Sequence, residues 1–216
     1  MQQNINSGSG RGGGRGEMQF DYRKMTASDR YKLMAQSVVP RPIAWIVTED
    51  EGVLNLAPFS YFTPLSSEPP TLIVSVGHRP DGTPKDTLAN LRKRGRCTLC
   101  LVSAELLEPM HYSSKSLSHE ESEAERFRIP MIEVFENYPP MVEGAPSAFA
   151  CTLLQEVDLS GSLTRPLILK IERQYLDDRC ITDAERLRLD CALLARVGAS
   201  YAHPGKQIDA PEIPNF

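Results

Sequence analysis

The chain has 216 residues, 41% of them hydrophobic, which is enough for one sizeable domain with its own core. Its 24 basic and 28 acidic residues are intermixed and sum to a net charge of -4, so no broad cationic field favours nucleic acid or an anionic membrane. No apolar run approaches the roughly 20 residues of a membrane-spanning helix, and the N-terminus lacks the apolar part of a secretory signal. The five cysteines lack the spacing of a disulfide framework, so we expect reduced thiols, no structural disulfide and a cytoplasmic location.

Residues 1–17 are expected to form a disordered glycine-rich tail, and residues 18–216 a single domain. The stretch from Ser7 to Gly16 is almost entirely glycine, serine and arginine, so it has no apolar surface to offset its ordering entropy. Arg11 and Arg15 would suit contact with RNA or a protein partner, but a solvated leader is the simpler interpretation.

Beyond the tail, the chain begins with a predicted helix over residues 28–36 and then shows mainly strand patterns. Strands are predicted at residues 41–48, 54–62, 71–77, 96–103, 147–159 and 166–177. Helices are predicted at residues 86–93, 104–112 and 120–127, and a hairpin loop of about four residues at 49–52. Strands joined mainly by hairpins, with helices inserted between them, predict a mainly β, antiparallel split barrel.

Two of the predicted strands are apolar on both faces, at residues 42–47 and 72–76. An isolated barrel would expose alternate residues of each strand to water. We therefore expect either a second subunit or the inserted helices to cover the outside of the barrel.

The most informative stretch runs from Ser75 to Thr87. A strand ends at Gly77, and after a turn Thr83 is a plausible N-cap, with Pro84 at the first helical position. The free N–H groups of that helix, together with Arg79, Lys85 and Thr87, would suit one terminal phosphate. The alternative is a solvated helix start. No Walker loop or Gly-x-Gly-x-x-Gly motif is present, which disfavours nucleoside triphosphate chemistry.

A second stretch, from Asn55 to Phe62, carries Pro58 within a strand. Because proline cannot donate to a strand ladder, we expect a bulge that aims backbone amides at a ligand. Ser60 and its neighbours would then contact a heterocycle, with the nearby aromatic residues as apolar walls. The alternative is an edge strand whose aromatic residues pack in the core.

Other patterns give little support to metal or hydrolytic chemistry. Cys97 and Cys100 lie three apart on a strand and so face opposite sides, which disfavours a zinc site. The four histidines lack ligand spacing, and only His78 lies near the proposed phosphate turn. The acidic run at 120–125 fits a solvated helix face, and no nucleophile has an identifiable base, so no catalytic side chain is assigned.

Several linked motifs nevertheless resemble one known family. They are Pro40-Arg41-Pro42-Ile43-Ala44-Trp45, Asn55-Leu56-Ala57-Pro58-Phe59-Ser60-Tyr61-Phe62, Glu68-Pro69-Pro70, Ser75-Val76-Gly77, Lys85-Asp86-Thr87 and the closing Arg196-Val197-Gly198-Ala199-Ser200-Tyr201-Ala202. Their order and spacing, from about Tyr22 to Tyr201, resemble the flavin reductase-like branch of the FMN-binding split barrels.

This resemblance implies a homodimeric split barrel that holds FMN, with FAD as an alternative, and that uses NAD(P)H as co-substrate. It places the isoalloxazine edge against residues 57–60, the ribityl chain near Ser75 and Gly77, and the phosphate on Arg79, Lys85 and Thr87. The expected cofactor-binding residues are Asn55, Ala57, Pro58, Phe59, Ser60, Ser75, Gly77, Arg79, Lys85, Asp86 and Thr87. Cys100 and His111 stand where asparagine is common in the family, both near the expected ligand.

Three functions follow for testing. The leading one is an NAD(P)H:flavin oxidoreductase, in which the nicotinamide stacks on FMN and its hydride passes to flavin N5. The second is a flavin-binding electron carrier or flavin donor for a partner oxygenase, without NAD(P)H activity of its own. The third is a cofactor-free dimerising scaffold whose basic loop binds another phosphorylated molecule.

Overall fold

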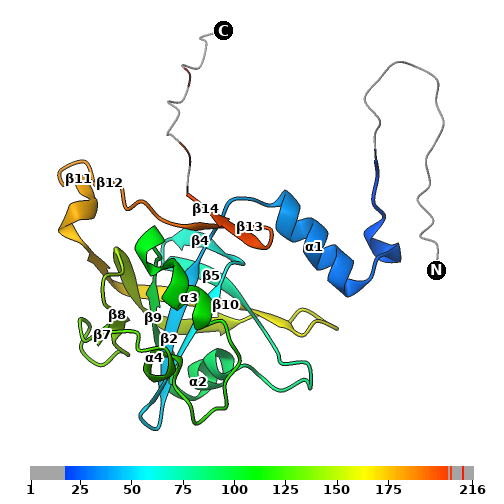
Figure 1. Cartoon of the computed structure of the whole chain (residues 1–216), viewed down its shortest axis with the longest axis horizontal. Helices are drawn as coiled ribbons and strands as arrows, with labels where there is room; N and C mark the ends of the chain where they lie inside the picture. The colour runs from blue at the N-terminus through cyan, green and yellow to red at the C-terminus, as the bar shows by residue number, and fades with distance from the viewer. Residues whose placement is uncertain (1–17, 204, 206–210, 212–216) are drawn as a thin grey trace.

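The computed structural model describes residues 18–203, 205 and 211, and the predicted glycine-rich tail lies outside them (Figure 1). The helical elements are η1 (Tyr22–Lys24), α1 (Ala27–Ser37), α2 (Asp86–Arg94), η2 (Ala104–Leu106), α3 (Leu107–Tyr112), α4 (Glu123–Arg126) and η3 (Asp178–Cys180). The main strands are β2 (Ala44–Asp50), β3 (Val53–Phe59), β4 (Phe62–Ser67), β5 (Pro70–Gly77), β6 (Arg96–Cys100), β9 (Ser147–Glu156) and β10 (Thr164–Leu176). Shorter strands are β1 (Arg41–Pro42), β7 (Met131–Ile132), β8 (Met141–Val142), β11 (Ile181–Asp183), β12 (Arg188–Leu189), β13 (Ala195–Val197) and β14 (Ser200–Ala202).

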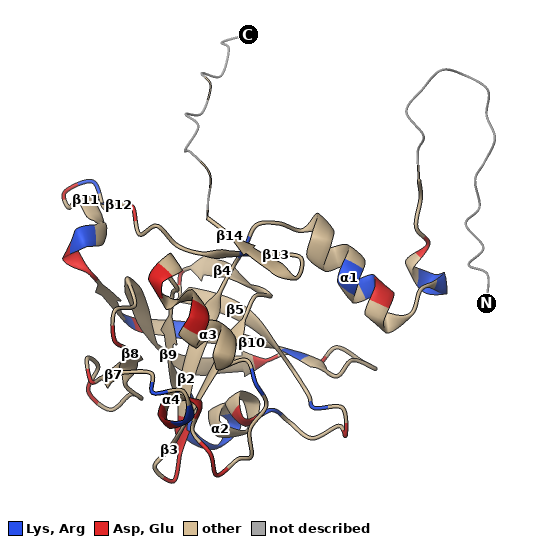
Figure 2. Ribbon diagram, viewed as in Figure 1, with Lys and Arg blue, Asp and Glu red and all other residues tan. Residues whose placement is uncertain are grey.

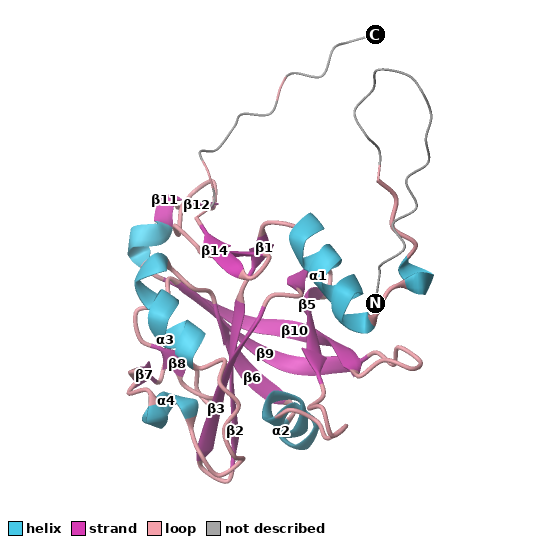
Figure 3. Cartoon of the chain, turned by 45° about the vertical axis from the view of Figure 1, so that its right-hand side comes forward, coloured by secondary structure: helices cyan, strands magenta, loops and turns pink. Residues whose placement is uncertain are grey.

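The centre of the molecule is a seven-stranded antiparallel sheet in the order β3-β2-β6-β9-β10-β5-β4 (Figure 3). A smaller sheet of β1, β13 and β14 lies beside it. Strands β3 and β4 are at opposite ends of the order, yet only Ser60 and Tyr61 connect them. The sheet must therefore curl until its two edges meet, which confirms the predicted antiparallel split barrel.

Two cores lie on the two sides of β2, which explains its doubly apolar sequence. Ala44 and Ile46 face the inner core, inside the barrel, together with Leu88 and Leu91 of α2. Trp45 and Val47 face an outer core that includes residues of α3 and α4. The chain's own helices thus cover the outside of β2. Cys97 and Cys100 belong to different cores, as their spacing predicts, and all five cysteines are free thiols.

Several predicted element boundaries need correction. The hairpin loop is shorter than expected, because Asp50 pairs with Val53 and only Glu51 and Gly52 form the turn. Both turn residues have positive φ, of 50° and 84°, which is the backbone of a two-residue type I′ turn. The predicted helix at 120–127 shortens to α4, and the one at 104–112 begins as the 3₁₀ turn η2. The strand predicted at 54–62 is two strands, broken where the barrel closes.

The expected bulge at Pro58 is absent, since this residue pairs in regular register with Trp45. Strand β3 is an edge of the sheet, so the missing N–H of proline removes no ladder hydrogen bond on its open side. The edge-strand interpretation of this stretch was therefore the right one for the backbone. Among the described residues, backbone N–H groups without an acceptor lie just after β3, at Ser60 and Tyr61 of the β3–β4 junction.

Charged residues of both signs are spread over the described ribbon, and acidic ones gather at the β2–β3 turn (Figure 2). Asp50 at that turn is bonded by Lys93 at 2.7 Å and by Arg94 at 2.9 Å, and these bonds lower the pKa of Asp50. They fasten the hairpin to the C-terminal end of α2. None of the described helices is long and apolar enough to cross a membrane.

Candidate functional site

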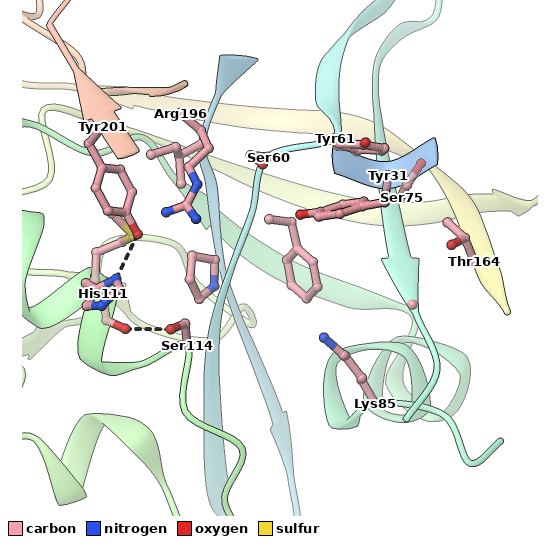
Figure 4. A pocket seen from close by; sticks show the side chains of 15 residues that line it. Tyr31, Ser60, Tyr61, Ser75, Lys85, His111, Ser114, Thr164, Arg196 and Tyr201 are labelled. Atoms are coloured by element: carbon pink, nitrogen blue, oxygen red, sulfur yellow. Dashed lines mark hydrogen bonds between the residues drawn. The ribbon is translucent and has the colours of Figure 1, made fainter. Parts of the chain in front are cut away.

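A cavity of about 360 Å³ lies where α1, α3 and the β13–β14 hairpin meet the barrel edge (Figure 4). Six of the expected cofactor-binding residues line it: Pro58, Phe59, Ser60, Ser75, Gly77 and Lys85. Its volume is in the range of small-molecule sites. Its charged lining residues are Lys85 and Arg196, with no Asp or Glu, so its field favours an anionic ligand.

Lys85 is the N-cap of α2, and no side chain caps that helix. Its ammonium group lies 5.9 Å from the centroid of the Phe59 ring and points into the cavity (Figure 4). The N-terminus of a nine-residue helix and a lysine therefore meet at one place, which is the chemistry that binds a phosphate.

The predicted N-cap at Thr83 is wrong by two residues. Asp81 accepts hydrogen bonds from the Thr83 backbone N–H at 2.9 Å and from its hydroxyl at 2.6 Å. Pro84 forms a β-bridge with His78, so residues 78–84 close a small loop before the helix begins. Because the Asp81 side chain bonds both the N–H and the hydroxyl of Thr83, Thr83 does not cap the helix, and Lys85 is the N-cap instead.

Arg79, Thr87 and Asp86 do not join Lys85 on the cavity wall. Arg79 forms an ion pair with Asp86 at 2.5 Å. The Thr87 hydroxyl is buried and accepts a hydrogen bond from the Asn55 amide at 2.9 Å. Arg79 and Thr87 are thus each bonded to another residue of the protein, and flavin contact by these residues stays a prediction.

Asn55 and Thr87 form part of a buried polar network between β2, β3 and α2. The amide of Asn55 also donates to the Thr48 hydroxyl at 3.1 Å, and Asn90 donates to the same hydroxyl at 3.2 Å. These bonds tie β2 and β3 to the first turn and middle of α2. They fix the position of the helix N-terminus at which Lys85 stands. Ala57, the last of the expected residues, lies in β3 opposite Ile46 and outside the cavity lining.

The junction of β3 and β4 offers backbone donors beside Phe59. Ser60 and Tyr61 lie between the two strands, and among the described residues neither of their N–H groups has a hydrogen-bond acceptor. Tyr61 stacks on Tyr31 of α1, with ring centroids 5.9 Å apart, and burial raises the pKa of its hydroxyl. The site therefore combines free amides with an aromatic wall, as a heterocycle requires.

The other end of the cavity is formed by residues that the sequence motifs did not assign to the site. The His111 Nδ1 atom lies 2.9 Å from the Tyr201 hydroxyl, and the Arg196 guanidinium lies 4.5 Å from the centroid of the Tyr201 ring. Figure 4 shows these side chains on the opposite side of the Ser60 backbone from Lys85. Residues of the cavity lining outside the predicted set are Tyr31, Ile43, Tyr61, Met110, His111, Ser114, Thr164, Arg196 and Tyr201.

Two buried contacts hold this second end in place. The Trp45 indole in β2 donates to the Ser113 hydroxyl at 2.9 Å, which fixes the end of α3 next to His111. Gly198, with a φ of 54°, packs against the Gln36 carboxamide and donates its N–H to Ala35 at 3.2 Å. The β13–β14 turn thus depends on a residue without a side chain.

Glu123 corrects the expectation of a solvated acidic helix face. Its carboxylate is buried and accepts a hydrogen bond from the Leu56 N–H of edge strand β3 at 2.9 Å. Burial raises the pKa of this carboxyl group above its ordinary value. Of the two departures from the family pattern, His111 lines the cavity, whereas Cys100 is fully buried in the outer core.

Residues 34–184 match the family model described as the flavin reductase like domain. The chain therefore belongs to the flavin reductase-like domain family, as the linked motifs predict. An uncharacterized protein of Deinococcus radiodurans is 36% identical over 194 residues, covering 85% of each chain. One from Aquifex aeolicus is 33% identical over 189 residues, covering 85% of this chain and 94% of the relative.

Solved structures give the same fold. Nitrilotriacetate monooxygenase component B from Bacillus cereus has a TM-score of 0.85 at 27% identity, covering 91% of this chain and 100% of that one. The 2-nitrobenzoate 2-nitroreductase of Pseudomonas fluorescens has a TM-score of 0.80 at 26% identity, covering 92% and 98%.

Proposed function

We propose that the chain binds FMN in the cavity between Lys85 and Arg196 and acts as an NAD(P)H-dependent flavin oxidoreductase. The observation that carries this proposal is the meeting of a lysine, an uncapped helix N-terminus and an aromatic wall in one cavity. Membership of the flavin reductase-like family supports the same ligand.

The residues divide the work of binding. Lys85 and the first N–H groups of α2 hold the phosphate, and Ser75 and Gly77 flank the ribityl chain. Phe59 and the free N–H groups of Ser60 and Tyr61 meet the ring and its polar edge. Asn55 and Thr87 keep the helix start in place, and Arg79 and Asp86 brace one another beside it.

When bound, FMN supplies a ring that takes up a hydride from the nicotinamide and passes the electrons on. The protein positions that ring and tunes it through hydrogen bonds, and no side chain of the site need act as acid or base. FAD would need room for its adenylate beyond Lys85, and it is tested alongside FMN.

The decisive assay follows NADH and NADPH oxidation by the purified full chain with FMN, and in parallel with FAD. We expect steady turnover that depends on added flavin. FMN binding without nicotinamide oxidation would overturn the reductase and favour the second candidate, an electron carrier or flavin donor. Likeness to a monooxygenase component favours an oxygenase as the partner that receives the electrons. A colourless protein that gains no thermal stability with FMN would overturn both and favour the scaffold.

We further propose that the chain is a cytoplasmic homodimer. Large exposed apolar side chains are concentrated before β1: Met18, Phe20, Tyr22, Tyr31, Met34, Val38 and Val39. In Figure 1 this segment extends away from the barrel, and within the described chain α1 buries only Ala35. A second copy would cover this surface.

Light scattering with gel filtration tests the dimer. The measured mass of the parent should be twice that of one chain, and the double variant Met34→Lys with Val38→Lys should have the mass of one chain. Leu187→Lys, at an exposed apolar residue on the β11–β12 turn, is the matched control and should leave the dimer intact. A parent of one chain mass would contradict this proposal.

A further inference from the structure

Two cations line the cavity, and a flavin phosphate accounts for one of them. Lys85 stands at the helix N-terminus, and Arg196 stands on β13 at the other end (Figure 4). No carboxylate among the lining residues neutralises either one. A cation held beside a cavity without an acidic neighbour has a free charge to offer to a ligand.

Arg196 keeps most of its hydrogen-bonding capacity. Among the described residues, its one side-chain hydrogen bond runs from Nε to the Gly198 carbonyl at 3.2 Å. That bond and the Tyr201 ring, 4.5 Å away, fix the plane of the guanidinium. The two terminal NH₂ groups are left as a fork of donors, which matches the paired oxygens of a carboxylate or phosphate.

The side chains around Arg196 make the same end of the cavity polar. The Tyr201 hydroxyl and the His111 ring are linked at 2.9 Å, and the Ser114 hydroxyl donates to the His111 carbonyl at 2.6 Å. Met110 and Ile43 provide an apolar floor. A planar organic anion would therefore find an apolar body site and a charged anchor together.

We propose that Arg196 anchors the anionic group of the second substrate, a carboxylate or phosphate, against the flavin held from the Lys85 end. This inference rests on the proposed function, because it takes the flavin to occupy the middle of the cavity. Arg196 would then select for anionic partners without contributing to flavin affinity.

The test uses the FMN-loaded full chain and two probes, benzoate for a carboxylate and NADP⁺ for a phosphate. Each probe is titrated while the visible flavin spectrum is followed, and FMN affinity is measured separately by fluorescence. Arg196→Met removes the charge, and Arg196→Lys keeps the charge without the forked donors. Arg173→Met, at an exposed position of β10, is the matched control.

We expect Arg196→Met to weaken the binding of one or both probes about tenfold or more. Arg196→Lys should have an intermediate affinity, and Arg173→Met should bind the probes as the parent does. FMN affinity should change by less than about threefold in all three. Loss for benzoate alone identifies a carboxylate substrate, and loss for NADP⁺ alone identifies the nicotinamide phosphates.

Equal probe binding by parent and Arg196→Met would overturn the inference, as would a parent that holds FMN but binds neither probe. A loss of FMN affinity in Arg196→Met comparable to that of Lys85→Ala would also overturn it, because Arg196 would then belong to the flavin site. A parent that binds no FMN overturns the proposed function itself and is recognised before any probe is added.

Discussion

The Lys85 end of the cavity is built largely from one stretch of chain, whereas the Arg196 end is assembled from distant ones. Ser75, Gly77 and Lys85 follow one another within β5, a short loop and the start of α2. His111 and Tyr201, by contrast, are 90 residues apart in the sequence and meet only through the fold. The first end is therefore visible as a local motif, and the second is not.

The largest effect is expected at the Lys85 end. Lys85→Ala should weaken FMN binding by about 1.5 to 3 kcal/mol, roughly 10- to 150-fold, because a charge-assisted phosphate contact is lost. Arg79→Ala is the informative partner variant and should have a smaller effect, since Arg79 already pairs with Asp86. Fluorescence titration of FMN measures both. An equal loss of FMN affinity in the two variants would mean that Arg79 also contacts the phosphate.

At the Arg196 end, the strongest structural dependence is on Gly198. Gly198→Ala should destabilise the fold by about 1 to 3 kcal/mol, because its φ is positive and a Cβ would overlap the Gln36 carboxamide. Urea unfolding measures the loss. Combining Gly198→Ala with Gln36→Ala should recover the part of the stability loss that comes from the overlap. Gly161→Ala, at a glycine with positive φ and open space around it, measures the cost of backbone strain alone. No recovery in the double variant would rule out the clash.

Tyr201→Phe removes only the hydroxyl that meets His111. We expect a loss of stability of about 0.5 to 1 kcal/mol with FMN affinity unchanged, because this contact is partly exposed and lies away from Lys85. Thermal unfolding and FMN titration of the same samples separate the two effects. A marked drop in FMN affinity would mean that the two ends are not independent.

The smallest effect is expected from Glu123, which accepts a hydrogen bond from edge strand β3 outside the cavity lining. Because burial raises its pKa, this group favours the folded state most at low pH, and that contribution is lost as pH rises through the folded-state pKa. Glu123→Gln does not titrate and can still accept from Leu56 N–H. The Tm of the variant relative to the parent should therefore rise with increasing pH. A pH-independent difference would contradict a raised pKa.

The same contrast explains what the sequence could predict. Hairpin spacing and doubly apolar strands such as β2 were enough for the antiparallel barrel, and linked local motifs placed Phe59, Ser60 and Lys85 at one cavity. Hydrogen bonds between side chains and nearby groups could not be predicted from the sequence. Asp81 bonds the Thr83 N–H, and the helix begins later than expected, while Asn55 bonds the Thr87 hydroxyl within a buried network.

Arg196 was missed as a site residue for a different reason, and His111 was expected near the ligand only from the family resemblance. Each stands in a segment that was noted, one as a departure from the family pattern and the other in the closing motif. Nothing local joins them, because the β13–β14 hairpin lies far along the chain and is held beside the barrel by the pairing of β13 with β1. The sequence feature that could have indicated this end of the site is the arginine and the tyrosine of the closing motif, Arg196 and Tyr201.

A crystal structure of the full chain with FMN tests the central claim most directly. The account predicts phosphate oxygens about 2.7–3.2 Å from Lys85 Nζ and the first N–H groups of α2, with the ring against Phe59 and the Ser60 amide. Arg196 should remain free of the cofactor. FMN bound outside this cavity, or with its phosphate on Arg196, would contradict the account.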